Sequence, residues 1–409
     1  MADTAIVILL GQSLNHWRGS TRELTTGDAS ARQLVGGGAV SEMDFDAINS
    51  DLLFDWNETT SVVTQAETGG GQSPIAGIAT TLSAAGYTRI YLCATAVGGK
   101  KILDIHGRGS AVNTHGAMSR LVALAAAEGD TDPEIFFYSA HGEGDAVAGL
   151  TTDYEANALL FYQHCQLQAA QVLEDPTYKA PIILSLPAQN KEPTPGTDAS
   201  DDILIKTAIR NIADSTDIDN VILYGSIYHW EVGNSDWIHP TEAAYVLRGE
   251  AIGKVIADYI AATTYAPLRL RSVTLSGAEV TCQFTHNIVR DITEIGDVGS
   301  GLGGEDGFEY FDNGSSIAIS SIAYSGDTAT LTLASTPVGT AGQQEVRVGC
   351  QVTANSTGTW PADCAGSVVR KDMTAWTSTF DATYDHYDWA LQEVASGLPY
   401  TYTPTGSGG

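Results

Sequence analysis

Apolar residues in the first two-thirds of the chain occur as short runs that end at glycine or polar residues. Such runs are typical of strands that are buried on both faces of a parallel sheet. Segments with helical spacing of apolar positions separate them. The five runs are Ala5–Leu10, Arg89–Val97, Glu134–His141, Pro181–Leu186 and Asn220–Tyr228. The five helical segments are Ser73–Ala85, Thr114–Glu128, Asp153–Glu174, Ser200–Ala213 and Glu242–Ala262.

Strands that alternate with helices predict right-handed crossovers and an α/β fold. We therefore expect a three-layer α/β/α sandwich around a five-stranded parallel sheet, similar to flavodoxin in its layers. The long polar and Gly-rich stretch from Leu14 to Gly71 has only brief apolar pieces, such as Asp51–Trp56. We interpret it as loops and short strands over the edge of the sheet where ligands bind.

The pattern changes at Thr263–Pro267. Beyond it, short alternating runs separated by Gly and Asp turns predict a small antiparallel β-sandwich. The expected organisation is an α/β/α domain over residues 1–264, a β-sandwich over residues 268–373, and a C-terminal tail over residues 374–409. The end of that tail is rich in Gly and Ser and is expected to be disordered.

Composition narrows the classes of partner. A chain of 409 residues is longer than one hydrophobic core usually organises, which agrees with two domains. The formal net charge of −29 argues against nucleic acid and anionic membranes as partners. The N-terminus lacks the features of a secretory signal, and no stretch is long enough to span a bilayer, so we expect a cytoplasmic or virion-associated protein.

The five cysteines match no zinc or redox spacing. Buried free thiols are the simplest interpretation, and a bridge between Cys350 and Cys364 remains open. The histidines also show no spacing that is typical of metal ligands.

Residues that suit a serine hydrolase follow several of the predicted strands. Ser13 follows the first strand, Gly98 and Gly99 the second, and Asp236 and His239 lie in the loop after the fifth. The carboxyl ends of parallel strands meet at one edge of the sheet. A hydroxyl, a histidine, a carboxylate and amide donors are the groups that acyl transfer requires. Taken one at a time, these positions also suit capping residues and tight turns.

The blocks together resemble those of the SGNH (GDSL-type) hydrolases, in particular the carbohydrate esterase and sialate O-acetylesterase branch. Gly11-Gln-Ser is similar to the first block of that branch, Ala96-Val-Gly-Gly to the second, His141-Gly-Glu-Gly-Asp to the third, and Asp236-Trp-Ile-His-Pro to the last. The match spans residues 5 to 262. The chain departs from the branch at Leu14, His141 and Gly144, where Asn, Gln and Ser are usual.

The resemblance implies a Ser-His-Asp triad of Ser13, His239 and Asp236, with Ser13 as the nucleophile. It also implies an oxyanion hole formed by the amides of Ser13, Gly98 and Gly144. Gln12, Gly99 and His141 are further candidates for contacts with the substrate or the oxyanion. Neither a metal nor an organic cofactor is expected.

The function that follows from the resemblance is removal of O-acetyl groups from a carbohydrate or polysaccharide. The alternative is a non-catalytic carbohydrate-binding or structural component of a phage tail or another surface assembly. The expected partner is an acetylated glycan. Assembly through the β-sandwich, as a homo-oligomer or as a virion subunit, stays open.

Overall fold

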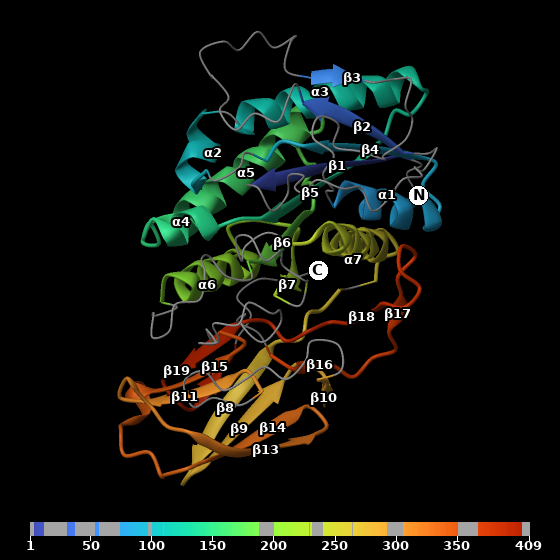
Figure 1. Cartoon of the computed structure of the whole chain (residues 1–409). Helices are drawn as coiled ribbons and strands as arrows, with labels where there is room; N and C mark the ends of the chain where they lie inside the picture. The colour runs from blue at the N-terminus through green and yellow to red at the C-terminus, as the bar shows by residue number, and fades with distance from the viewer. Residues whose placement is uncertain are drawn as a thin grey trace.

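The computed structural model describes residues 4–11, 31–36, 54–56, 74–96, 100–108, 110–187, 200–228, 230, 240–263, 265–292, 306–350 and 367–402. Its N-terminal part is an α/β domain whose five predicted strands are all present and mutually parallel (Figure 1). In their order across the sheet they are β4 (Arg89–Ala94), β1 (Thr4–Gly11), β5 (Glu134–Ala140), β6 (Ile182–Leu186) and β7 (Val221–Ser226).

The sheet has seven strands rather than the expected five. β2 (Ala31–Gly36) pairs in parallel with β4, and β3 (Phe54–Trp56) pairs antiparallel with β2 at the edge. Both come from the polar region that we expected to contain loops and short strands. β2 was not recognised because its sequence, ARQLVG, lacks the continuous apolar run of a central strand.

Helices cover both faces of this sheet (Figure 1). Alternate residues of β1 pack in opposite directions: Ile6, Ile8 and Leu10 belong to the core under α2, α3, α5 and α6, while Val7 and Leu9 belong to the core under α1 and α7. The helix bounds are α1 Ile75–Ala84, α2 Ile102–Arg108, α3 Ser110–Ala127, α4 Glu143–Val147, α5 Tyr154–Val172, α6 Ser200–Asp214 and α7 Glu242–Ile260. The five predicted helices are confirmed, and the short α2 and α4 are additional.

Glycines let α1 and α7 pack with their backbones in contact. A Cβ atom on Gly77 would lie 2.0 Å from the carbonyl oxygen of Val246, and one on Gly249 would lie 2.0 Å from that of Pro74. Gly253 faces the next turn of α1, so the two helices run in the same direction. Because α1 begins at the carboxyl edge of the sheet, α7 begins there as well.

The second domain is the predicted antiparallel β-sandwich. Its two main sheets have the strand orders β13-β14-β9-β8-β20 and β12-β11-β15-β19, and they enclose a separate apolar core. The strand bounds are β8 Leu270–Ser276, β9 Glu279–Phe284, β10 Ile288–Arg290, β11 Phe308–Asp312, β12 Ser315–Ser316, β13 Ile319–Ser325, β14 Thr328–Leu333, β15 Gln344–Val348, β16 Val369–Lys371, β17 Trp376–Thr377, β18 Asp385–His386, β19 Glu393–Ser396 and β20 Tyr400–Thr401.

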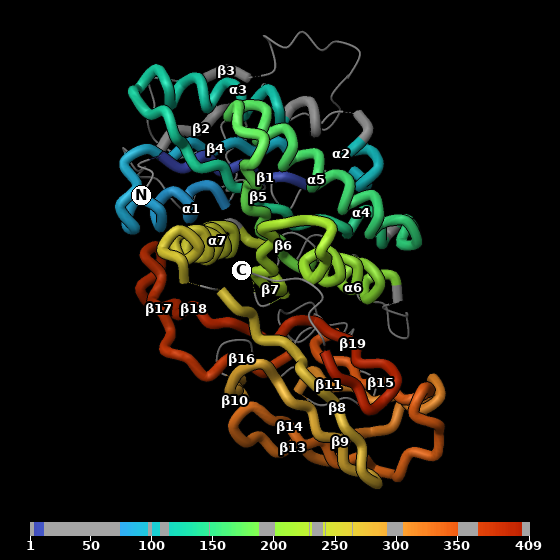
Figure 2. The backbone as a smooth tube through the Cα atoms, turned by 180° about the vertical axis from the view of Figure 1, so that it is seen from behind, coloured from blue at the N-terminus to red at the C-terminus, as the bar shows by residue number. Residues whose placement is uncertain are grey.

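The end of the chain is not the separate tail that we expected after residue 373. β19 pairs with β15 and β20 pairs with β8, so both strands complete the sandwich. β17 and β18, which precede β19 in the chain, run beside α7 (Figures 1 and 2). We call residues 367–402 the C-terminal segment. The strands of this segment were missed because each is only two to four residues long.

The described cysteines are buried free thiols. They are Cys93, Cys165, Cys282 and Cys350. Cys350 directs its sulfur towards the carbonyl oxygens of Val348 and Glu393, and Cys364, its proposed partner in a bridge, lies outside the described residues. Among the described helices, none combines the length and apolar character that a membrane span requires.

Candidate active site

The predicted site residues divide into two groups. Gly144 and His141 lie within the structure, whereas the six others lie outside the described residues: Gln12, Ser13, Gly98, Gly99, Asp236 and His239. Their positions in the chain are nevertheless bounded by described neighbours. The placement of these neighbours tests whether the blocks can meet.

Three of the four blocks leave from adjacent strands at one edge of the sheet. The strand register sets Gly11, at the end of β1, opposite Ala140, at the end of β5. On the other side of β1, Leu9 is opposite Ala94, and its carbonyl oxygen accepts a 2.9 Å hydrogen bond from the Thr95 amide. The chain therefore enters the Ser13, Gly98 and His141 blocks from three neighbouring positions.

The fourth block is bounded by Trp230 after β7 and by Pro240 before α7. Thr241 caps α7 and accepts a 3.3 Å hydrogen bond from the Ala244 amide on its side-chain oxygen. Because α7 runs parallel to α1, this N-terminus lies at the carboxyl edge of the sheet. The residues that precede Pro240, including His239, are thus connected to the same edge as the other blocks.

His141 is buried and fixed by two contacts, with only 1 % of its surface exposed. Its Nε2 lies 3.0 Å from the carbonyl oxygen of Lys100, and its Nδ1 lies 3.3 Å from the Tyr154 hydroxyl. A carbonyl oxygen only accepts, so Nε2 carries the proton in this arrangement. Lys100 directly follows the block that contains Gly98 and Gly99. His141 therefore fastens the end of that block.

Asp145 makes a second connection between the same two loops. Its carboxylate oxygens accept hydrogen bonds of 3.1 and 3.3 Å from the Ile102 amide at the start of α2. The side chain is buried and lies 3.8 Å from His141 Nδ1. Through these contacts Asp145 holds the third block against the start of α2.

The pKa shifts of this pair also favour a positioning role. Burial lowers the pKa of His141 to about 4, although its bond to Lys100 opposes the shift, so the imidazole is neutral at pH 7. Burial raises the pKa of Asp145 to about 6, opposed by the hydrogen bond from Ile102. A neutral His141 whose N–H is bound to Lys100 has no second N–H for a substrate oxygen.

Glycine occupies two positions of this third block for different structural reasons. Gly142 has a φ of +131°, and a Cβ atom there would lie 2.3 Å from Cγ2 of Ile205. Gly144 lies in the first turn of α4 and is partly exposed, while Glu143 and Asp145 on either side are buried. At Gly144 only the backbone can face a substrate.

Two residues near this edge were not singled out from the sequence. Thr95, just after β4, and Thr114, in α3, are buried and join their side-chain oxygens at 2.9 Å. Tyr154 donates a 3.0 Å hydrogen bond to the carbonyl oxygen of His141 and stacks its ring on the imidazole. A lone Thr or Tyr carries no sequence signal for such a contact, because its partner lies 13 or more residues away.

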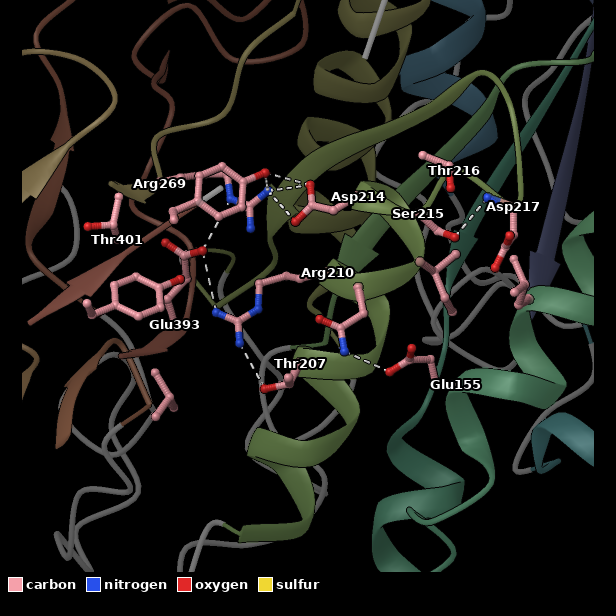
Figure 3. Close-up of a pocket in the computed structure, with 16 residues that line it drawn as sticks. Glu155, Thr207, Arg210, Asp214, Ser215, Thr216, Asp217, Arg269, Glu393 and Thr401 are labelled. Carbon is pink, nitrogen blue, oxygen red and sulfur yellow. Dashed lines mark hydrogen bonds and ion pairs between the residues drawn. The ribbon is translucent and has the colours of Figure 1, made fainter. Parts of the chain in front are cut away.

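A polar cavity of about 670 Å³ lies elsewhere, between the end of α6 and the sandwich (Figure 3). Arg269 is paired with two of its acidic side chains: Arg269 Nη1 lies 2.8 Å from Asp214, and Arg269 Nε lies 3.2 Å from Glu393. Because α6 starts after the carboxyl end of β6, its last residues lie at the opposite edge of the sheet. A helix of 15 residues is roughly 22 Å long. This cavity is therefore remote from the predicted active site.

Within the described part of the chain, no group of His, Cys, Asp or Glu side chains is arranged to hold a metal ion. The arrangement at the carboxyl edge of the sheet instead offers backbone amides and buried, mutually bonded polar side chains.

Comparisons with known proteins identify the fold. No family model and no curated protein matches the sequence. A solved carbohydrate acetylesterase from Xanthomonas citri matches with a TM-score of 0.57 at 13% identity, over 96% of this chain and 80% of its own. The chain therefore shares the fold of that solved structure. Since the match extends over 96% of the chain, the fold that the two proteins share includes the β-sandwich.

Two weaker structural matches are limited to about two-thirds of the chain. NanS has a TM-score of 0.42 at 13% identity, over 63% of this chain and 97% of its own. A carbohydrate acetylesterase from Sinorhizobium meliloti has a TM-score of 0.35 at 12% identity, over 63% of this chain and 99% of its own.

Proposed function

We propose that the chain is a serine esterase that removes O-acetyl groups from a carbohydrate. Ser13 attacks the ester carbonyl carbon while His239 takes the hydroxyl proton, and Asp236 orients and stabilises His239. His239 then returns the proton to the departing sugar oxygen, which leaves an acetyl group on Ser13. Water, deprotonated by His239, attacks this acyl-enzyme and releases acetate.

The oxyanion that forms on the carbonyl carbon needs N–H donors held in place beforehand. We assign this role to the backbone amides of Ser13, Gly98 and Gly144. Gly144 is the partly exposed residue of an otherwise buried block, which suits a backbone donor. It also replaces a side-chain donor that the resemblance would place at this position.

His141 takes a supporting role in this proposal rather than donating to the oxyanion. Its N–H is bound to Lys100 and its ring is buried. Together with Asp145, which holds Ile102, it links the Gly144 loop to the Gly98 loop. The two loops would thus keep a fixed separation around the ester oxygen.

The observation that supports the proposal is that the described residues flanking the four blocks lie at one sheet edge, with Gly11 opposite Ala140 and α7 beginning at that edge. The SGNH-type fold supports ester hydrolysis as the reaction class. The Xanthomonas citri protein is a carbohydrate acetylesterase, and we extend that substrate class to this chain as part of the proposal.

The test is hydrolysis of nitrophenyl acetate and release of acetate from acetylated polysaccharides by the unchanged protein and by Ser13→Ala. We expect the substitution to lower kcat by about a thousandfold or more, because the nucleophile is removed. Ser119→Ala, which changes a serine on the outer helix α3, is the matched control and should keep full activity.

If Ser13→Ala retains the activity of the unchanged protein, Ser13 is not the nucleophile. If the unchanged protein binds acetylated glycans but turns over no ester, the non-catalytic carbohydrate-binding alternative is favoured.

A further inference from the structure

The chain between Trp230 and Pro240 contains Asp236 and His239, and the elements on both sides of it contact the C-terminal segment. On one side is the stretch that continues β7, from Ser226 to Trp230. On the other side is α7, which begins at Glu242 after Pro240 and the N-cap Thr241.

Hydrogen bonds between side chains and the main chain fix the first part of the β7 end. The hydroxyl of Tyr228 donates a 2.8 Å hydrogen bond to the carbonyl oxygen of Ala390. The amide of Gln392 donates a 3.2 Å hydrogen bond to the side-chain oxygen of Ser226. All these side chains are buried, so no water competes for the bonds.

Aromatic packing fixes the last described residue before the loop. Trp230 is 2 % exposed, and its ring centroid lies 5.8 Å from that of Tyr384 and 5.7 Å from that of His386. The other face of this cluster is closed by Trp376, which stacks on His386 with a centroid distance of 3.7 Å. Three side chains of the C-terminal segment, Trp376, Tyr384 and His386, therefore form one aromatic cluster with Trp230.

A buried carboxylate about 12 Å along α7 from its first residue holds this helix against the C-terminal segment. Glu250 is fully buried, and its oxygens accept hydrogen bonds from the amides of Thr379 and Phe380, both at 2.9 Å, and from the hydroxyl of Ser378 at 2.5 Å. His386 Nε2 lies 3.2 Å from the same carboxylate. A buried carboxylate needs several donors, and here one short stretch of the C-terminal segment supplies four.

His386 is the point where the two ends meet, because its ring packs on Trp230 while its Nε2 bonds to Glu250. We propose that the C-terminal segment positions the acid and base of the triad by holding both ends of the loop that carries them, with His386 as the positioning residue. This inference rests on the proposed esterase function. It means that the C-terminal segment, which completes the β-sandwich, also contributes to ester hydrolysis in the α/β domain.

The test uses His386→Ala in the full chain, compared with His386→Gln, which keeps an N–H for Glu250. The matched control is Tyr402→Phe, which removes a hydroxyl that bonds to Asp214 at the other contact between the domains. The readouts are kcat, KM and the pH dependence of kcat/KM for nitrophenyl acetate, with circular dichroism and Tm to confirm folding.

We expect His386→Ala to lower kcat by about 100-fold with little change in KM, because misplacement of a catalytic group by about 1 Å has an effect of that size. The acidic limb of kcat/KM should also move, since the Asp236–His239 contact sets the pKa of the base. His386→Gln should recover most of kcat, and Tyr402→Phe should leave kcat within twofold.

A folded His386→Ala protein with unchanged kcat and an unchanged acidic limb would overturn the inference and leave the esterase proposal standing. If His386→Ala does not fold, Trp230→Phe, which keeps most of the apolar surface, must show the same fall in kcat. If the unchanged protein has no activity that depends on Ser13, the esterase proposal fails first, and this inference fails with it.

Discussion

Two junctions join the α/β domain to the β-sandwich, and their side chains differ in kind. The α6 junction consists of Arg210, Asp214, Arg269, Glu393 and Tyr402, which form ion pairs and hydrogen bonds around an open cavity (Figure 3). The α7 junction consists of Trp230, Glu250, Ser378, Tyr384 and His386, in which aromatic rings pack on one another and hydrogen-bond donors surround the buried carboxylate of Glu250.

This difference suggests that the two junctions have different roles, one in stability and one in turnover. The charged α6 junction lies at the edge of the sheet opposite the predicted active site, so we expect it to contribute stability alone. The aromatic α7 junction encloses both ends of the predicted catalytic loop, so we expect it to influence turnover. The predictions below test this separation.

The largest effect on stability is expected at the α6 junction from Arg269→Met. The guanidinium bonds to both Asp214 and Glu393 and lies 3.9 Å above the Tyr402 ring. Its removal leaves Glu393, which is 3 % exposed, without its main ionic partner. We expect a loss of roughly 3–5 kcal/mol in the free energy of unfolding, measured by urea denaturation.

The same Arg269→Met protein should keep kcat within twofold for nitrophenyl acetate under conditions where it is folded. A fall in kcat comparable to that of His386→Ala would show that the two junctions are not functionally distinct.

A smaller and pH-dependent effect on stability is expected for Glu309, a buried residue of β11. It lies on the α6 side of the sandwich, where its charge and that of Arg210 both influence the pKa of Cys350. Burial raises its pKa to about 7, and the charge of Arg347 opposes the shift. The folded state therefore binds the proton more tightly than the unfolded state. The resulting cost is absent below pH 4.5 and complete above about pH 7.

Glu309→Gln should thus stabilise the protein by up to roughly 3 kcal/mol at pH 8 and by clearly less at pH 5.5, in urea denaturation at the two pH values. Glu345→Gln, a less buried carboxylate on the adjacent strand β15, is the control. Equal stabilisation by Glu309→Gln at both pH values would mean that the proton on Glu309 does not contribute to stability.

The sequence predicted those elements whose own residues show whether they are buried. Ala5–Leu10 is apolar at every position and forms most of the fully buried strand β1. The other four central strands are built on similar apolar runs that include single polar residues, such as Ser139 in β5 and Ser185 in β6. β2, which lies between β3 and β4, was not predicted because its sequence, ARQLVG, lacks a continuous apolar run. The role of Gly77 in helix packing was equally invisible, since its neighbour Val246 is far along the chain.

The candidate site divides in the same way. The spacing of the blocks identified the edge of the sheet, and the register of Gly11 with Ala140 agrees with it. The direction of the His141 ring could not be predicted, because Lys100 and His141 are 41 residues apart. The contact of Glu250 with His386 spans 136 residues and involves a segment whose pattern resembled a tail.

The central claim is that Ser13 is an activated nucleophile, and the most direct measurement is covalent labelling with diisopropyl fluorophosphate. The Ser13 oxygen would bond to phosphorus, fluoride would leave, and the hydroxyl proton would pass to His239. Trypsin releases residues 1–18 as one peptide, in which Ser13 is the single serine. The account predicts one adduct per chain, on Ser13, together with complete loss of esterase activity. An active protein that is labelled at another residue, or that loses no activity when Ser13 is labelled, would contradict it.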